Sequence, residues 1–184
     1  HIVLVPTANR KRFLGPALAR QMLDLKEQWI PWEKKSDTAW WGGALTGSHW
    51  QVSAPYPLTR HAVVEHFVQN PSDRIRLQST QIPANGRPLT VDVPLQPRFK
   101  PRDAYRSKCV VLLPGNDIAS GSSWYMAGNS VVLMPKPHLD HILYFDLQPW
   151  VHYVPLENDP KDILRKLDWV LDNQDKAQEI VAQA

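Results

Sequence analysis

The sequence predicts an α/β fold, a Rossmann-like parallel sheet with helices on both faces. The first observation is a repeated pattern of short, unbroken apolar runs that are bounded by proline. Such runs are too short for buried helices and fit strands that are covered on both faces. The second observation is the spacing between the runs, about 15 to 20 residues, which suits a helical crossover and is too long for a hairpin. The runs are residues 109–113, 130–134 and 150–154.

This order predicts two consecutive right-handed βαβ units. Loops that leave parallel strands share one edge of the sheet, and ligands bind there. The first such loop, residues 114–123, is rich in small residues and leads into a helix expected to begin near Ala119 or Ser123. Small residues let the backbone approach a ligand, and free N–H groups at a helix start favour phosphate or another anion. The second loop, residues 135–138, adds the cation Lys136 at the same edge.

Periodicity and turn residues predict the remaining elements. Glycines within residues 42–47 predict a second glycine-rich loop, and residues 34–37 predict a polar turn. Residues 71–106 contain two possible strands, at 74–77 and 89–93. The rest of this stretch is typical of a binding loop or of an excursion between strands, and no function is assigned to it. The other expected elements are strands at residues 2–6 and 38–41, and helices at residues 14–27, 60–67 and, as a pair, 159–184.

Composition bounds the class of protein. The net charge is only +3, and the densest basic cluster, residues 10–12, precedes a helix instead of lining an aromatic platform, so nucleic acid is not an expected partner. The single cysteine, Cys109, excludes an internal disulfide framework. No apolar run approaches membrane-spanning length. The chain begins at His1 and reads at once as a strand, so we expect a fragment whose upstream part would carry any targeting signal.

Histidines and acids offer little support for a metal site. His138, Asp140 and His141 place two ligands on one turn with no third nearby, which favours a capping or surface role. His61 and His66 lie five residues apart and cannot share a helix face as an i, i+4 ligand pair does. No metal is therefore expected.

Nucleophilic catalysis is also not indicated. The segment 121–124 lacks the second glycine of a hydrolase nucleophile elbow. Cys109 lies in a predicted buried strand, where a thiol is inert, and His152 has apolar neighbours that predict a core histidine. Residues 115–117 are themselves typical of a plain turn, which is the alternative to a binding loop.

Residues 115–121, Trp124, residues 129–134 and residues 149–156 together resemble the C-terminal half of the CAP10-type glycosyltransferases, glycosyltransferase family 90. This family includes the protein O-glucosyltransferases and the fungal capsule-associated xylosyltransferases. The Pro-Trp-Val-His-Tyr-Val-Pro run at residues 149–155 is specific to that family, and residues 162–180 fit it as well. The resemblance runs from Lys108 to the C-terminus, is weaker over residues 29–60 and is absent over residues 71–106.

The resemblance implies the donor-binding half of a GT-B glycosyltransferase at residues 38–184, with residues 1–37 as the end of a preceding domain or a linker. It implies transfer of a glucosyl or xylosyl group from a UDP-sugar to a hydroxyl group of a protein, a glycan or a lipopolysaccharide. No cofactor is expected beyond this donor. The family's catalytic base is expected to be an upstream aspartate, for which no counterpart is found here. The compartment stays open: cytoplasm in a bacterium, or endoplasmic reticulum or Golgi lumen in a eukaryote.

Two glycines depart from the family pattern. Relatives read Trp-Arg-Gly where this chain has Trp41-Gly42-Gly43, and many carry an arginine at the position of Gly121. Arginine forms bidentate contacts with phosphate that lysine copies poorly, so Arg60, Lys108 and Lys136 remain to neutralise a diphosphate. The residues implied in donor binding are Gly42, Gly43, Thr46, Arg60, Gly115, Asn116, Asp117, Ala119, Ser120, Gly121, Ser130 and Lys136.

Gly42 also favours an alternative: a non-catalytic relative that keeps the fold and acts as a binding module. A third reading is another nucleotide-binding α/β enzyme. Binding of UDP by the chain would distinguish a glycosyltransferase from the non-catalytic relative.

Overall fold

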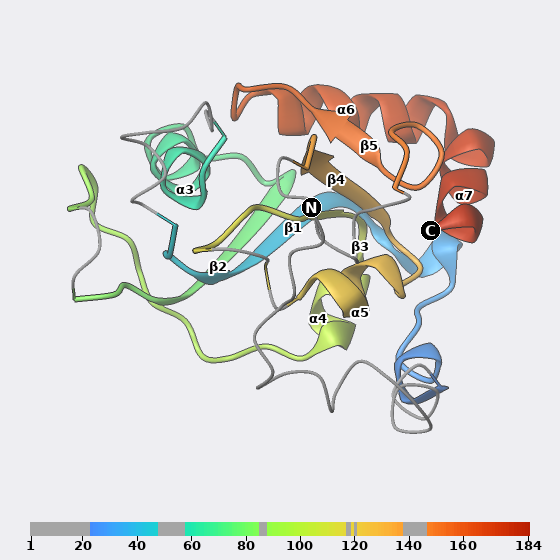
Figure 1. Cartoon of the computed structure of the whole chain (residues 1–184), viewed down its shortest axis with the longest axis horizontal. Coiled ribbons are helices and arrows are strands. Elements are labelled where there is room, and N and C mark those ends of the chain that lie inside the picture. Colours follow the sequence, from blue (N-terminus) through green and yellow to red (C-terminus); the bar gives the residue numbers. More distant parts are fainter. Residues whose placement is uncertain (1–22, 48–57, 85–87, 117–118, 120, 138–146) are drawn as a thin grey trace, which may run out of the picture.

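The chain forms one parallel five-stranded sheet in a computed structural model that describes residues 23–47, 58–84, 88–116, 119, 121–137 and 147–184. Within this part the strand order is β2-β1-β3-β4-β5 (Figure 1). The strands are β1 (Ser36–Ala44), β2 (Ile75–Gln81), β3 (Ser107–Val111), β4 (Val131–Pro135) and β5 (Val154–Leu156). The helices are η2 (Trp32–Lys34), α3 (Arg60–Gln69), α4 (Pro101–Tyr105), α5 (Ser122–Met126), α6 (Asp162–Asp172) and α7 (Gln174–Gln183).

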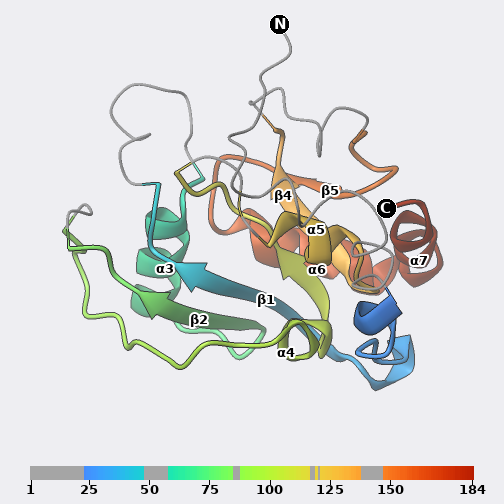
Figure 2. The ribbon, with the colours of Figure 1, turned by 60° about the horizontal axis from the view of Figure 1, so that its bottom comes forward.

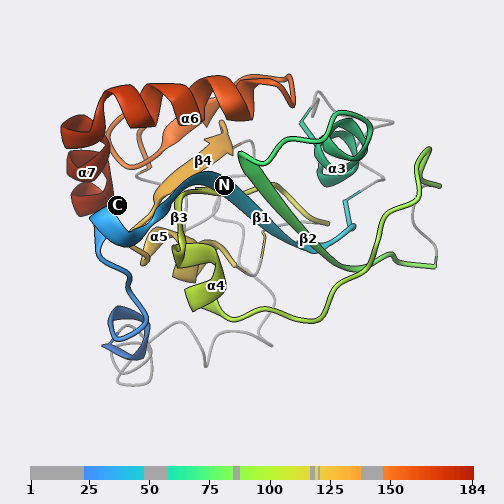
Figure 3. The same cartoon turned by 180° about the vertical axis from the view of Figure 1, so that it is seen from behind.

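Helices cover both faces of this sheet, as the uninterrupted apolar strands require. Helices α3, α6 and α7 lie over one face, whereas α4 and α5 lie over the other (Figures 1 and 3). Alternate strand residues divide between two buried clusters: Val111 and Leu133 belong to the first, and Val110 and Val132 to the second. The predicted α/β class, the Rossmann-like parallel sheet and the two C-terminal helices are therefore confirmed.

The third predicted strand lies later in the chain than expected. Strand β5 begins at Val154, and the preceding residues form a turn in which Trp150 adopts a φ of 65°. His152 is half-buried in this turn, and its Nδ1 accepts a hydrogen bond from the backbone N–H of Gln148 at 2.9 Å. The prediction of a core histidine was therefore wrong, because the turn places the ring at the rim of the fold.

Strand β1 is longer than predicted at both ends. It includes Gly42 and Gly43, so the glycine-rich loop expected to begin at residue 42 begins only after Ala44. It also includes Ser36 and Asp37, and the polar turn expected there was wrong. Parallel pairing on both sides, with β2 and with β3, supplies hydrogen-bonding partners along its length.

The excursion expected at residues 71–106 contributes an edge strand to the sheet, β2, and the short helix α4. Residues 89–93 are not a strand, although Val93 is buried in the first apolar cluster. Of the helix predicted at residues 14–27, residues 23–26 are helical. The strand predicted at residues 2–6 lies outside the described residues. No helix in the described ranges combines the length and apolar character needed to cross a bilayer.

Candidate functional site

The strand order changes direction between β1 and β3, and this point defines the candidate site. The chain passes from β1 to β2 on one side and then returns to place β3 on the other side of β1. In doubly wound parallel sheets, the loops at the carboxyl ends of the strands on either side of such a point form the ligand site. Here these loops are residues 45–47 after β1 and residues 112–116 after β3. Figure 2 shows the carboxyl end of β1 beside α3.

Arg60, the first residue of α3, joins these two loops. Its Nη1 donates to the carbonyl of Ala44 at 2.9 Å and to Thr46 Oγ1 at 2.8 Å. Its Nη2 and Nε donate to the carbonyl of Leu113 at 3.2 and 3.4 Å. The helix start is itself capped, because Thr59 Oγ1 accepts from the backbone N–H of Ala62 at 3.2 Å. The cap fixes the first turn of α3 and thereby the position of the Arg60 backbone, from which the side chain extends.

Two glycines let the loops approach one another and Arg60. Gly47 has a φ of +85°, and a side chain there would place its Cβ 2.5 Å from the carbonyl oxygen of Gly115. A Cβ on Gly115 would lie 2.9 Å from Arg60 Nη2. The side chain of Asn116 closes the contact, since its Oδ1 accepts from the backbone N–H of Gly47 at 2.9 Å. Glycine is required at both positions for the two loops to touch.

Helix α5 follows the second loop and carries aromatic side chains onto β1. Tyr125 is buried, and this burial raises the pKa of its hydroxyl. The hydroxyl donates a hydrogen bond to the carbonyl oxygen of Gly42 at 3.4 Å. Ser122 Oγ donates to the carbonyl of Ala119 at 2.7 Å and closes the turn that begins the helix. A Cβ on Gly121 would lie 2.8 Å from the Tyr125 ring. The ring thus occupies the space that a side chain at residue 121 needs.

Gly42 is crowded by aromatic rings in a similar way. A Cβ there would lie 2.5 Å from Trp40 Cζ2 and 2.7 Å from Phe99 Cε1. Its φ is not positive, since Gly47 is the glycine with that conformation among the described residues. Trp40 and Gly42 are two residues apart on one strand, so their side chains share a face. The Trp40 and Phe99 rings therefore occupy the space that a side chain at residue 42 needs.

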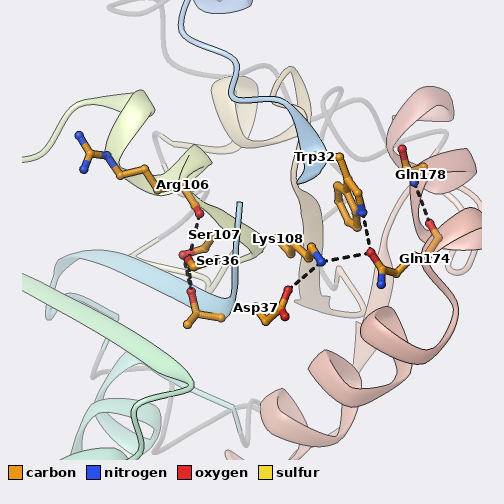
Figure 4. A network of polar contacts seen from close by, with 9 residues as sticks. Trp32, Ser36, Asp37, Arg106, Ser107, Lys108, Gln174 and Gln178 are labelled. Carbon is orange, nitrogen blue, oxygen red and sulfur yellow. Dashed lines mark hydrogen bonds and ion pairs between the residues drawn. The ribbon is translucent and has the colours of Figure 1, made fainter. Parts of the chain in front are cut away.

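Two of the predicted residues lie at the opposite edge of the sheet. Ser130 precedes β4, and its Oγ donates to the carbonyl of Ser107 and accepts from Lys35 Nζ, at 2.7 and 2.9 Å. Lys108 is buried in β3, where its Nζ forms an ion pair with Asp37 at 2.7 Å (Figure 4). Both residues stand near the amino ends of their strands, away from the loops that Arg60 joins.

Lys108 belongs to a polar network that docks the C-terminal helix. Its Nζ donates to Gln174 Oε1 at 3.1 Å, and Trp32 Nε1 donates to the same oxygen at 2.9 Å (Figure 4). The Lys108 ammonium also lies 5.5 Å from the centre of the Trp32 ring. The lysine therefore has a structural role here and does not reach the carboxyl edge.

Lys136 remains at the expected edge. It follows the carboxyl end of β4 and is exposed. Asp117 and Ser120 lie outside the described residues, as do His138, Asp140 and His141. The structure thus brings together Gly43, Thr46, Arg60, Gly115 and Asn116. Gly42 precedes Gly43 in β1, and Ala119 and Gly121 lie at the start of α5, whose Tyr125 donates to the carbonyl of Gly42. In the described ranges, no group of three or more His, Cys, Asp or Glu side chains is arranged to hold a metal ion.

Sequence reasoning missed the backbone part of this site. Arg60 binds the carbonyls of Ala44 and Leu113, and carbonyls carry no sequence signal. Gly47 was treated only as part of the glycine-rich loop at residues 42–47. A lone glycine after a strand is a signal of positive φ, but its partner loop is visible only in the structure.

Several known glucosyltransferases are similar to this chain in sequence. Protein O-glucosyltransferase 2 of Danio rerio is 33% identical over 78 residues, which cover 42% of this chain and 16% of that protein. Protein O-glucosyltransferase 3 of Homo sapiens is 33% identical over 82 residues, 44% of this chain and 16% of that protein.

O-glucosyltransferase LpsA of Dichelobacter nodosus is 30% identical over 138 residues, 73% of this chain and 37% of that protein. The chain thus matches well under half the length of these relatives. Residues 16–184 match the sequence profile described as Glycosyl transferase family 90. This profile spans the sheet, the Arg60 contacts and both C-terminal helices, and the chain therefore belongs to glycosyl transferase family 90.

Proposed function

We propose that this chain is the donor-binding part of an O-glycosyltransferase of the GT-B type. The donor is a UDP-sugar that carries glucose or xylose, and the acceptor is a hydroxyl group of a protein, a glycan or a lipopolysaccharide. Family membership supports the reaction class. The names of the relatives, protein O-glucosyltransferases and O-glucosyltransferase LpsA, support glucose as the sugar and oxygen as the acceptor atom.

One observation carries the proposal: the two loops at the β1/β3 switch point are joined to each other by Arg60 and by Asn116. Loops held in this way present a preset backbone surface at the edge where parallel sheets bind nucleotides. The partners of the guanidinium in these contacts are carbonyl and hydroxyl oxygens, and an arginine side chain stays protonated in proteins.

The chemistry assigned to this part is stabilisation of the leaving group. In the transfer, the bond between the sugar's anomeric carbon and the β-phosphate oxygen breaks, and a bond to the acceptor oxygen forms. The acceptor proton passes to a base, for which we name no residue of this chain. The departing UDP gains negative charge, which fixed dipoles and cations stabilise. Lys136, exposed after β4, is the side chain we assign to this charge.

Calorimetric titration of the chain with UDP and with uridine tests the proposal. We expect UDP to bind about tenfold or more tightly than uridine, because a charge-assisted phosphate contact contributes about 1.5 kcal/mol or more. Equal binding of the two ligands, or no binding of either, would contradict the proposal and support a non-catalytic relative that acts as a binding module.

A further inference from the structure

We propose that Arg60 is a positioning residue of the donor site: it presets the two ligand-facing loops and does not itself bind the diphosphate. This inference rests on the proposed function for the identity of the ligand. The contacts that carry it are those of the guanidinium with the strand ends.

The guanidinium is already engaged on all three of its nitrogen atoms. Nη1 contacts the β1 side, at Ala44 and Thr46, while Nη2 and Nε contact the β3 side, at Leu113. A bidentate fork toward phosphate needs two parallel N–H groups. Arg60 could form one only by giving up at least one of these contacts.

Close packing around the guanidinium restricts its movement as well. Gly115 passes so near that a Cβ on it would lie 3.2 Å from both Arg60 Cζ and Thr46 Oγ1. Gly115 also lies close to Gly47, whose backbone N–H donates to Asn116 Oδ1. Moving the Arg60 side chain toward a ligand would therefore disturb both loops at once. Its role is to hold the backbone surface in one geometry, which lowers the ordering cost of binding.

Charge and geometry can be separated by two substitutions. Arg60→Lys keeps the charge but loses the planar fork, and Arg60→Met removes both. Titration with UDP and with uridine should show the affinity for both ligands falling by the same factor, about tenfold, in either variant. Arg74→Met is the matched control. Arg74 lies just before the amino end of β2 and forms an ion pair with Asp168, so it contacts neither loop of the site. Its affinities should equal those of the wild type.

A direct phosphate contact gives a different result and would overturn the proposal. In that case Arg60→Met weakens UDP and leaves uridine unchanged, and Arg60→Lys retains most of the UDP affinity. Thr46→Val is a milder variant, since it removes one acceptor of Arg60 and keeps the side-chain shape. We expect it to weaken both ligands by a smaller common factor.

Hydrogen exchange tests the contacts without any ligand. Amides of residues 44–47, 113, 115 and 116 should exchange faster in Arg60→Lys, Arg60→Met and Thr46→Val, while amides of β3 and β4 keep their protection. Unchanged exchange in both loops would overturn the positioning role. If the wild-type chain binds no UDP, the proposed function fails, and the exchange measurement still decides whether Arg60 holds the loops.

Discussion

Gly42→Ala is the substitution for which the structure makes the most specific prediction. The added Cβ would lie 2.5 Å from Trp40 Cζ2 and 2.7 Å from Phe99 Cε1, well inside contact distance. The Trp40 ring is buried, and the partly buried Phe99 packs against it. Trp40 is 3% exposed and packs edge-on against Phe99, with ring centres 4.7 Å apart. The backbone at this point is held by the pairing of Gly42 with Gln78 of β2.

The expected loss follows from overpacking. Forcing a methyl group into a packed site costs about 1–3 kcal/mol in the free energy of unfolding. For a chain of this size, each kcal/mol lowers the thermal midpoint by about 2–4 °C. Gly42→Ala should therefore lower the midpoint by about 2–12 °C. Gly42→Arg should lower it at least as much, without tightening UDP binding, since its side chain would start against the same rings.

Gly43→Ala is the matched control. It is the neighbouring residue of the same strand, and its Cβ would meet Trp41 Cζ2 at 3.5 Å and Arg60 Nη1 at 3.8 Å, which are ordinary contacts. Replacing glycine by alanine at a compatible position stabilises by about 0.4–1 kcal/mol through the unfolded state. Thermal unfolding of the three variants should give opposite signs at residues 42 and 43. An unchanged midpoint for Gly42→Ala, together with tighter UDP binding by Gly42→Arg, would refute the reasoning.

Two further predictions concern lysines. Lys136→Met should lower the affinity for UDP by about tenfold and leave uridine unchanged, with Lys34→Met, an exposed lysine of η2, as the control in the same titrations. An equal loss of affinity for UDP and uridine would show that Lys136 does not contact the phosphates. Lys35 is buried, which lowers its pKa from 10.5 to about 7. Between these values the unfolded chain binds more protons than the folded one, so this lysine makes stability rise with pH by up to about 1.4 kcal/mol per unit. Urea unfolding should be measured for wild type and Lys35→Met across this pH range. The free energy of unfolding of wild type should rise relative to that of Lys35→Met as pH increases. An equal pH dependence of the two free energies would contradict the assignment.

The sequence alone determined the sheet and its direction. Residues 109–113 and 130–134 are apolar at every position or nearly so, because both faces of a central parallel strand are buried. Their separation required a crossover, and hence parallel pairing. The C-terminal helices were equally readable, since Leu167 and Val170 recur on one buried face. The family resemblance came from the same segments.

The tertiary structure decided which candidate residues meet. Ser130 precedes the apolar strand β4, and Lys108 belongs to the apolar strand β3. Both lie near the amino ends of these strands, at the edge of the sheet opposite Arg60. Gly42 was read as a lost arginine because sequence shows a missing side chain and not the indole that fills its place. Arg60 acts on the carbonyl of Ala44 in β1 and on that of Leu113 in the loop after β3, which are distant in the chain. Backbone groups are the same at every residue, so their partners depend on how the chain is folded in space.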